Sequence, residues 1–147
     1  MADEHDRLEA EVLTPEGEVF SGELVQLSTR TTVGEVGILA RHIPMVARLV
    51  PAELRLHTSE TEVERYAQGE GWLEVFANRA RVLIAEAIPP DQLDVAELRA
   101  KLEDAEARLA EAEEGSAAFE QAERERARAE TFIAIAENNS AASSAPA

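Results

Sequence analysis

The chain contains no cysteine. Disulfides, thiolate metal sites and cysteine nucleophiles are therefore excluded, and cysteine usage gives no information about the redox compartment. Aromatic residues are also scarce, at 4% of the 147 residues, so a hydrophobic core has to be built from aliphatic side chains and alanine. No apolar run approaches the ~20 residues of a membrane-spanning helix. The acidic start "MADEHDRLEA" lacks the apolar segment of a signal peptide, and we expect a soluble, cytoplasmic protein.

Positive charge is in the minority: 14 Lys and Arg residues stand against 30 Asp and Glu, and the formal net charge is -16. Binding to nucleic acid needs a basic surface, and so does binding to an anionic membrane surface, so both are excluded as functions of this chain. Trp72 is accordingly expected to pack in the core or in an interface rather than to stack on a base. A basic protein partner, or solubility alone, explains the acidic charge better.

Residue patterns that support catalysis are missing. His5, His42 and His57 show no spacing typical of metal ligands. The segment "GEVG" lacks the lysine of a phosphate-binding P-loop, and no serine lies in a nucleophile elbow. We therefore expect neither a metal site nor intrinsic catalysis, and we expect Gly34 and Gly37 to supply tight turns.

Residues 1–87 show the alternation of apolar and polar residues that is typical of β-strands. Leu54 and Leu56, for example, alternate with polar neighbours. The segments "WLEVF" and "ARVLI" flank a short turn at Asn78, which predicts a hairpin. Turn residues recur every eight to twelve residues or so. This part of the chain is therefore predicted to be a β-sandwich of short antiparallel strands.

The C-terminal part is predicted to be helical. The prolines of "IPPD", residues 88–91, predict a hinge, because proline fits inside neither a helix nor a central strand. Residues 92–137 are rich in helix formers and are divided by "GS", which predicts an antiparallel two-helix hairpin. The small, polar residues 138–147 are expected to be disordered. Heptad spacing predicts the seam of the hairpin at Leu98, Leu102, Ala105, Leu109 and Ala112, and at Phe119, Ala122, Ala129, Ile133 and Ala136.

Four stretches, in this order, resemble the epsilon-subunit family of F-type ATP synthases, whose mitochondrial counterpart is called delta. "VLTPEGEVFSGE" is similar to the first hairpin of the family, and "GEVGILARHIPMV" to its Gly-Ile-Leu-Pro-Gly-His-x-Pro signature. "YAQGEGWLEVFANRARVLIAEA" is similar to its closing strands, and "LDVAELRAKLEDAEARL" to the start of its helical region. The resemblance implies a β-sandwich followed by a two-helix domain, the same layout that the residue periods predict.

The resemblance also implies a non-catalytic rotor subunit of the ATP synthase central stalk. Its sandwich would bind the gamma subunit and the ring of c subunits, and would help to couple ion-driven rotation to ATP synthesis. In bacterial members the helices can extend towards the alpha and beta subunits and inhibit ATP hydrolysis. The expected location is the cytoplasmic face of the cell membrane, as a peripheral protein with no direct membrane insertion and no nucleic-acid partner.

The signature loop supplies the residues that the resemblance places in contact with the c ring or gamma. Glu35, Arg41 and His42 are its polar members, and Ile38 and Leu39 belong to the same contact region while anchoring the loop in the sandwich. Where the family has Pro-Gly, this chain has an Ala-Arg pair. The additional cation is interpreted either as a contact with the ring or as a solvated side chain.

Some bacterial members bind ATP through an Ile/Leu-Asp-x-x-Arg-Ala motif in the helical domain. Leu93 and Asp94 match its start, but Glu97 and Leu98 stand where Arg-Ala is expected. The next Arg-Ala pair begins at Arg99, about 200° further round a helix. The sequence thus argues against ATP binding and predicts no cofactor. Asp94 is interpreted as an acid in the first helical turn, favoured by the helix dipole.

Inhibition of hydrolysis is expected to use basic residues of the second helix. Arg124, Arg126 and Arg128 are the candidates because they lie close together in sequence. Glutamates surround them, so ion pairs within the helix are the competing explanation.

Two functions from different classes therefore stay open. The first is the rotor subunit, which predicts stable association with gamma. The alternative is a free-standing β-sandwich that binds a ligand or acts as a chaperone-like module with a helical clamp. Thermal stabilisation by a small molecule in the absence of gamma would favour the alternative.

Overall fold

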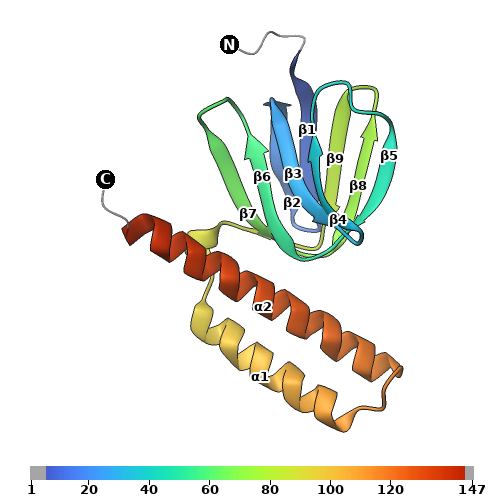
Figure 1. Cartoon of the computed structure of the whole chain (residues 1–147), viewed down its shortest axis with the longest axis vertical. Helices are drawn as coiled ribbons and strands as arrows, with labels where there is room; N and C mark the ends of the chain where they lie inside the picture. Colours follow the sequence, from blue (N-terminus) through green and yellow to red (C-terminus); the bar gives the residue numbers. More distant parts are fainter. Residues whose placement is uncertain (1–5, 145–147) are drawn as a thin grey trace. The chain divides into compact units, whose positions relative to one another are not determined.

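The computed structural model describes residues 6–144. The chain forms two compact units that divide between Pro89 and Pro90 (Figure 1). The first unit contains only strands and their connections. The second contains a short 3-10 helix and two α-helices. No helix in the described part of the chain is long and apolar enough to span a membrane.

The first unit is built from ten short strands. Their bounds are β1 (Leu8–Thr14), β2 (Gly17–Leu24), β3 (Gln26–Thr31), β4 (Gly34–Ile38), β5 (Met45–Leu49), β6 (Ala52–His57), β7 (Val63–Gln68), β8 (Gly71–Phe76), β9 (Arg79–Ile84) and β10 (Ala87–Ile88).

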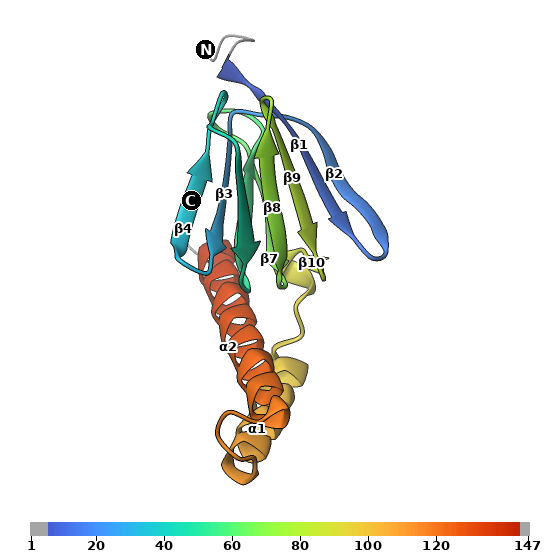
Figure 2. The same ribbon diagram turned by 90° about the vertical axis from the view of Figure 1, so that its right-hand side faces the viewer.

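These strands form two halves that face each other across a core. One half runs β10-β7-β6-β3 with β4 on the far side of β3, and the other runs β5-β8-β9-β1-β2. A single register pair, Thr31 with Leu49, connects the halves. Figure 2 shows β8, β9, β1 and β2 side by side in the second half. The architecture is the predicted β-sandwich.

One strand pair differs from the antiparallel prediction, because β1 pairs with β9 in parallel. The connection between these two strands spans most of the sandwich. Alternation within a strand sets which face is buried but carries no information about the direction of a distant partner. The other strand pairings among the described residues are antiparallel.

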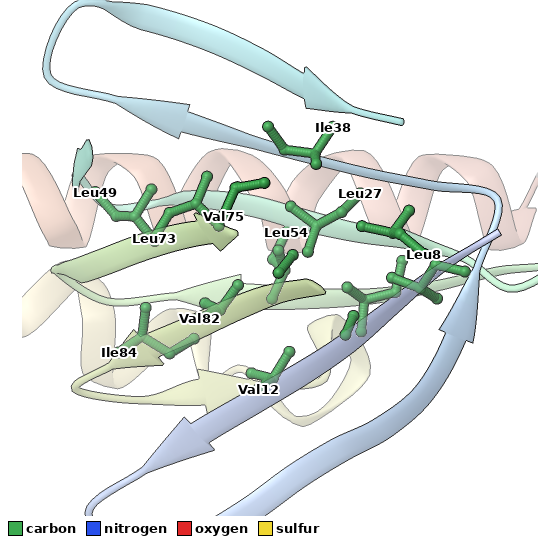
Figure 3. Close-up of a cluster of buried hydrophobic side chains, with 14 residues drawn as sticks. Leu8, Val12, Leu27, Ile38, Leu49, Leu54, Leu73, Val75, Val82 and Ile84 are labelled. Atoms are coloured by element: carbon green, nitrogen blue, oxygen red, sulfur yellow. The ribbon is translucent and has the colours of Figure 1, made fainter. Parts of the chain in front are cut away.

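The core is aliphatic, as the scarcity of aromatic residues requires. Leucine, isoleucine, valine and alanine side chains from both halves meet between the layers (Figure 3). Burial alternates along the strands: β9 reads exposed, buried, exposed, buried, exposed, buried. The fully or almost fully buried members are Leu8, Ala10, Val12, Leu24, Leu27, Ile38, Leu49, Leu54, Leu56, Leu73, Val75, Ala80, Val82 and Ile84.

Two of the tight turns have left-handed backbone conformations. The β8–β9 hairpin turns through Ala77 and Asn78, whose φ angles of 50° and 60° are those of a type I′ turn. Gly34 has a φ of 132°, which only glycine adopts easily, and so it matches its expected turn role. Gly37 does not match, because it lies within β4 opposite Ser28 and has no positive φ. Its small size instead leaves room for the Gln26 side chain, whose amide nitrogen would lie 3.1 Å from an added Cβ.

The second unit starts with the 3-10 helix η2 (Pro90–Gln92), followed by α1 (Val95–Glu111) and α2 (Ala117–Ser144). The first α-helix therefore starts three residues later than the expected Gln92. Asp94 is its N-cap: the backbone is extended there, and the carboxylate accepts a hydrogen bond of 3.1 Å from the Glu97 amide. The interpretation of Asp94 as a first-turn acid is corrected to that of a capping residue, which satisfies an amide that would otherwise lack a partner.

The predicted seam is occupied mainly by small residues. Ala122, Ala129 and Ala136, seven residues apart, are buried in α2, and Leu98 and Ala105 are buried in α1. The other predicted seam residues, Leu102, Leu109, Ala112, Phe119 and Ile133, are partly exposed. Ion pairs join the helices, among them Arg99 with Glu137 at 2.8 Å and Arg108 with Glu125.

The C-terminal residues correct the expected boundaries. The second helix was expected to end at residue 137, but α2 continues to Ser144. Once a helix has formed, each further residue adds a hydrogen bond at little entropic cost, and no glycine or proline interrupts residues 138–144. The expectation of disorder is therefore wrong for those residues, and residues 145–147 lie outside the described part. The expected hinge, residues 88–91, divides between the end of β10 and the start of η2.

Candidate docking surfaces

The loop between β4 and β5 contains a tight turn. The His42 amide donates to the Leu39 carbonyl at 3.2 Å, which closes a four-residue turn. Arg41 is the third residue of that turn and has a φ of 62°, whereas Ala40 has no positive φ. These angles are those of a type II turn, which favours proline at its second position and glycine at its third. The Pro-Gly pair of the family would fit this backbone directly, and Arg41 occupies it with strain.

Asn78 holds this turn from outside. Its Oδ1 accepts a hydrogen bond of 2.8 Å from the Arg41 amide, and its Nδ2 donates to the Arg7 carbonyl at 2.9 Å. The Asn78 carbonyl also accepts from the Glu9 amide at 3.1 Å. One residue of the β8–β9 turn therefore connects the β4–β5 loop to the start of β1.

The polar candidates of the loop have local partners. The Arg41 guanidinium lies 3.5 Å from the Asp6 carboxylate, and both side chains are largely exposed. The His42 Nδ1 lies 2.8 Å from the Ile43 carbonyl, so this nitrogen carries the proton and donates. The arrangement provides no nucleophile for His42 to activate, and it acts here as a structural hydrogen-bond donor.

The apolar candidates separate into an anchor and an exposed pair. Ile38 is 0% exposed and belongs to the core, so it anchors the loop and cannot touch a partner, which corrects its assignment as a contact residue. Leu39 is 57% exposed, so it does not anchor the loop as expected. Ile43, which the sequence did not single out, is 74% exposed. The loop therefore presents two uncovered aliphatic side chains next to Arg41.

Glu35 is not part of this loop surface. It lies near the start of β4, three residues and roughly 10 Å of strand before Ile38. Its carboxylate pairs with Arg30 on the neighbouring strand at 3.1 Å, and both side chains are exposed. Of the five predicted contact residues, Glu35 thus lies near the start of β4 and Ile38 in the core. The other three, Leu39, Arg41 and His42, lie in the loop that follows β4.

A second exposed surface lies on the outer face of the β5-β8-β9-β1 sheet. Arg48 is in register with Trp72, Trp72 with Leu83, and Leu83 with Leu13, so these four side chains form one row across four strands. Trp72 is 50% exposed and Leu83 41% exposed. The Arg48 guanidinium lies 5.9 Å from the centre of the Trp72 ring, which is within cation–π range. We refer to these four residues as the Trp72 row.

Ion pairs occupy the same face next to the Trp72 row. Arg81 pairs with Glu11 at 3.7 Å and Arg79 with Glu9 at 2.8 Å, in both cases between β9 and β1. The Trp72 row thus consists of three apolar side chains with Arg48 at one end and ion pairs along its flank, an arrangement typical of protein interfaces. Sequence reasoning considered Trp72 for an interface but missed the rest of the row. The sequence pattern that could have revealed the row is an apolar residue at an outward-facing position in each of several neighbouring strands.

The three candidate inhibitory arginines, Arg124, Arg126 and Arg128, do not form one cluster. Arg124 and Arg128 are four residues apart on α2 and share a face, whereas Arg126 lies about 200° from Arg124. Arg126 lies 3.9 Å from Glu130, and the Arg128 guanidinium lies 4.6 Å from the centre of the Phe132 ring. Proximity in sequence therefore overstated their proximity in space.

A groove of about 420 Å³ lies between the start of the helical unit and the end of α2. Its lining contains the acidic Asp91 and no lysine or arginine. Asp94 is engaged in capping α1. A triphosphate needs cations or free backbone amides, and this lining supplies neither a basic side chain nor a glycine-rich turn. The groove is lined by Pro90, Asp91, Leu93, Val95, Ala136, Asn139, Ser140 and Ser143.

No group of three or more potential metal ligands occurs among residues 6–144. What the described residues do present is a tethered loop with exposed aliphatic side chains and an apolar row with a charged flank. Together with the architecture, these features define the class of protein: a β-sandwich unit with exposed apolar side chains, followed by a helical-hairpin unit.

The chain belongs to the ATP synthase delta/epsilon-chain family. The family model described as "ATP synthase, Delta/Epsilon chain, beta-sandwich domain" matches residues 7–90. The ATP synthase epsilon chain of Persephonella marina is 39% identical over 127 residues, which are 86% of this chain and 93% of the relative. That of Halalkalibacterium halodurans is 36% identical over 129 residues, 88% of this chain and 96% of the relative.

Solved structures share the fold. A chain of the Euglena gracilis mitochondrial ATP synthase, in a structure of its OSCP/F1/c-ring assembly, superposes with a TM-score of 0.76 at 23% identity. The match covers 87% of this chain and 80% of that one. A chain from the central stalk and c-ring of the Tetrahymena thermophila enzyme gives a TM-score of 0.58 at 17% identity. The family resemblance that the sequence motifs indicated is confirmed.

Proposed function

We propose that this chain is a non-catalytic rotor subunit of the ATP synthase central stalk. Its sandwich binds gamma through the Trp72 row and stands on the c ring through the β4–β5 loop, so that ion-driven rotation of the ring is coupled to ATP synthesis. The observation that carries this proposal is the exposed Trp72 row, whose members lie in register across four strands. The sandwich that presents this row matches the family model of the ATP synthase delta/epsilon chain.

The proposal includes a location and a regulatory role. As part of the stalk, the chain is a peripheral protein on the cytoplasmic face of the cell membrane. The helical unit acts as a brake on ATP hydrolysis when it extends towards the alpha and beta subunits. The ion pairs that join the helices support such a role, because solvent-exposed pairs hold the hairpin together with only a modest contribution to its stability.

Association with gamma tests the sandwich part of the proposal. The chain and gamma, mixed at micromolar concentration, are expected to elute together in gel filtration. Trp72→Glu places a charge in the centre of the Trp72 row, and truncation of a central aromatic residue typically costs an interface 2 kcal/mol or more. We expect the dissociation constant to rise by about thirtyfold or more, measured by calorimetry.

Thr61→Glu is the matched control. Thr61 is exposed in the β6–β7 turn of the other sheet, and its replacement adds the same single charge. This variant is expected to bind gamma within about twofold of the parent chain, because a distant exposed charge has little effect. Separate elution of the parent chain and gamma would overturn the proposed function. An equal loss in both variants would show that the row is not the interface.

A further inference from the structure

The β4–β5 loop is held in place by a side chain that belongs to neither of its strands. Its turn is strained at Arg41, since a left-handed conformation costs a residue with a Cβ about 1 kcal/mol or more. The turn makes one internal backbone hydrogen bond, from His42 to Leu39. A strained turn with a single internal bond needs external contacts to stay in one conformation, and Asn78 supplies one to the Arg41 amide.

Asparagine fits this position for two independent reasons. The backbone at residue 78 has a φ of 60°, which Gly, Asn and Asp tolerate better than other residues. The side chain must also accept from the Arg41 amide and donate to the Arg7 carbonyl. Of the three tolerant residues, only asparagine has both a donor and an acceptor. The two requirements together specify this residue.

We propose that Asn78 is the positioning residue of the docking loop. Its Oδ1 accepts from the Arg41 amide while its own backbone carbonyl accepts from Glu9 of β1, and together these bonds fix the turn in the conformation in which Leu39 and Ile43 meet the c ring. This inference rests on the proposed function of the loop. In this proposal Asn78 does not touch the ring itself. It acts through Arg41, and it favours docking by pre-organising the loop.

Three variants separate the side chain from the turn. Asn78→Gly removes both side-chain hydrogen bonds but keeps a residue that accepts the left-handed backbone. Asn78→Asp keeps the acceptor for Arg41, but a carboxylate oxygen takes the place of the donor to the Arg7 carbonyl. Ala77→Gly is the matched control, because it introduces a glycine at the other left-handed position of the same turn, where φ is 50°, and leaves Asn78 in place.

The first measurement is the exchange rate of the Arg41 amide proton by NMR in the full-length chain. Loss of a hydrogen bond worth about 1 kcal/mol corresponds to a change of roughly fivefold to tenfold. We expect exchange to accelerate by about that factor in Asn78→Gly and to stay within about twofold in Asn78→Asp and Ala77→Gly. Amides of the core strands should exchange alike in all four proteins, which shows that the sandwich remains folded.

The second measurement is the affinity of the gamma complex of each variant for detergent-solubilised c rings, with gamma alone as the baseline. The parent complex is expected to bind the rings more tightly than gamma alone. Asn78→Gly should lose about tenfold in affinity. Asn78→Asp should retain ring affinity within about threefold, as a conservative replacement that rescues the Arg41 contact, and Ala77→Gly should retain it as well. All variants should bind gamma as the parent does.

The outcomes distinguish the inference from the function on which it rests. If the parent complex binds rings no better than gamma alone, the proposed docking function of the loop fails. If the parent complex binds rings more tightly than gamma alone but the Asn78→Gly complex binds them equally tightly, Asn78 is not the positioning residue of the loop. The same conclusion follows if Asn78→Gly weakens ring binding without faster exchange at Arg41, or if Ala77→Gly or Asn78→Asp weakens it equally.

Discussion

Gln68 is a polar side chain with no exposed surface, and both ends of its amide are used. Its Oε1 accepts from the Thr29 hydroxyl at 2.6 Å, and its Nε2 donates to the Val50 carbonyl at 2.9 Å. Gln68→Ala would remove the partner of the buried Thr29 hydroxyl and of the partly buried Val50 carbonyl, and would open a cavity. We expect the free energy of unfolding to fall by about 2–4 kcal/mol, measured by urea denaturation with the fluorescence of the single tryptophan.

Gln26→Ala provides the comparison for this prediction. Gln26 is only partly buried, and its amide nitrogen makes a hydrogen bond of 3.1 Å to the Ser28 hydroxyl. Water can replace that bond, so the expected loss is below about 1 kcal/mol. Similar losses in the two variants would show that the Gln68 bonds do not contribute beyond those of an ordinary surface amide.

Single residues were the least predictable part of this chain. The sequence indicated the turn at Asn78, but not its bonds to Arg7 and Arg41, because the partners lie 71 and 37 residues away. It named Ile38 a contact residue, although a buried side chain and an exposed one look alike in a short apolar run. Gly71 gave no signal at all, yet an added Cβ there would lie 1.9 Å from the Leu83 carbonyl oxygen.

The ion pair between Arg108 and Glu125 joins the two helices and makes the hairpin sensitive to acid. The hydrogen bond from Arg108 holds the pKa of Glu125 below its ordinary value of 4.5. A carboxyl whose pKa is lowered by folding stabilises the fold above the unfolded pKa, and that contribution is lost as the pH falls through the folded pKa. The stabilisation is therefore present at pH 7, begins to decline near pH 4.5 and is lost as the pH falls through the lowered pKa of Glu125.

Glu125→Gln should remove this dependence on pH. At pH 7 we expect the helical signal at 222 nm to melt at a lower temperature than in the parent chain, and we expect the two melting temperatures to converge as the pH falls through the lowered pKa of Glu125. Glu123→Gln, on the same helix, removes the same charge from an exposed position and should show a smaller difference at pH 7. A constant difference between parent and Glu125→Gln across the whole range would contradict the role of the ion pair.

Elements were predicted well where local composition decides them. The strands and both helices follow from apolar periodicity and from helix-forming residues. The ends of the helices were predicted less accurately. Helix α1 begins after Asp94 because that carboxylate caps it, and α2 continues to Ser144 because no glycine or proline interrupts it. The parallel pairing of β1 with β9 could not be foreseen, since strand direction is fixed by long-range packing.

For the molecule as a whole, the order of a strand-rich part and a helical part could be read from the sequence, and the family follows from motifs distributed over both. The docking surfaces could be read only in part. The Trp72 row combines residues from four strands, and its members are brought together by register rather than by spacing along the chain. The loop motif could be located, but its exposed members, Leu39 and Ile43, could be separated from the buried Ile38 only in three dimensions.

The proposed brake predicts a measurable release when the helices are removed. Deletion of residues 90–147 leaves a unit with its own core, which is the part that the family model matches. ATP synthase assembled with this shortened chain should keep gamma bound and hydrolyse ATP at least about twofold faster, as expected if the helices hold half or more of the complexes arrested. Unchanged hydrolysis in a fully assembled complex would contradict a brake.

The geometry of α2 sharpens this test, because Arg124 and Arg128 share a face that Arg126 does not. If that face meets acidic segments of the catalytic subunits, Arg124→Gln with Arg128→Gln should reproduce part of the release in the full-length chain. Arg126→Gln, which removes a cation that is 3.9 Å from Glu130, should not. The measurement is the steady-state rate of ATP hydrolysis for each variant, compared at equal occupancy of the complex by this subunit. Release by Arg126→Gln alone would assign the brake to the opposite face, and release by neither would mean that the helices act without these cations.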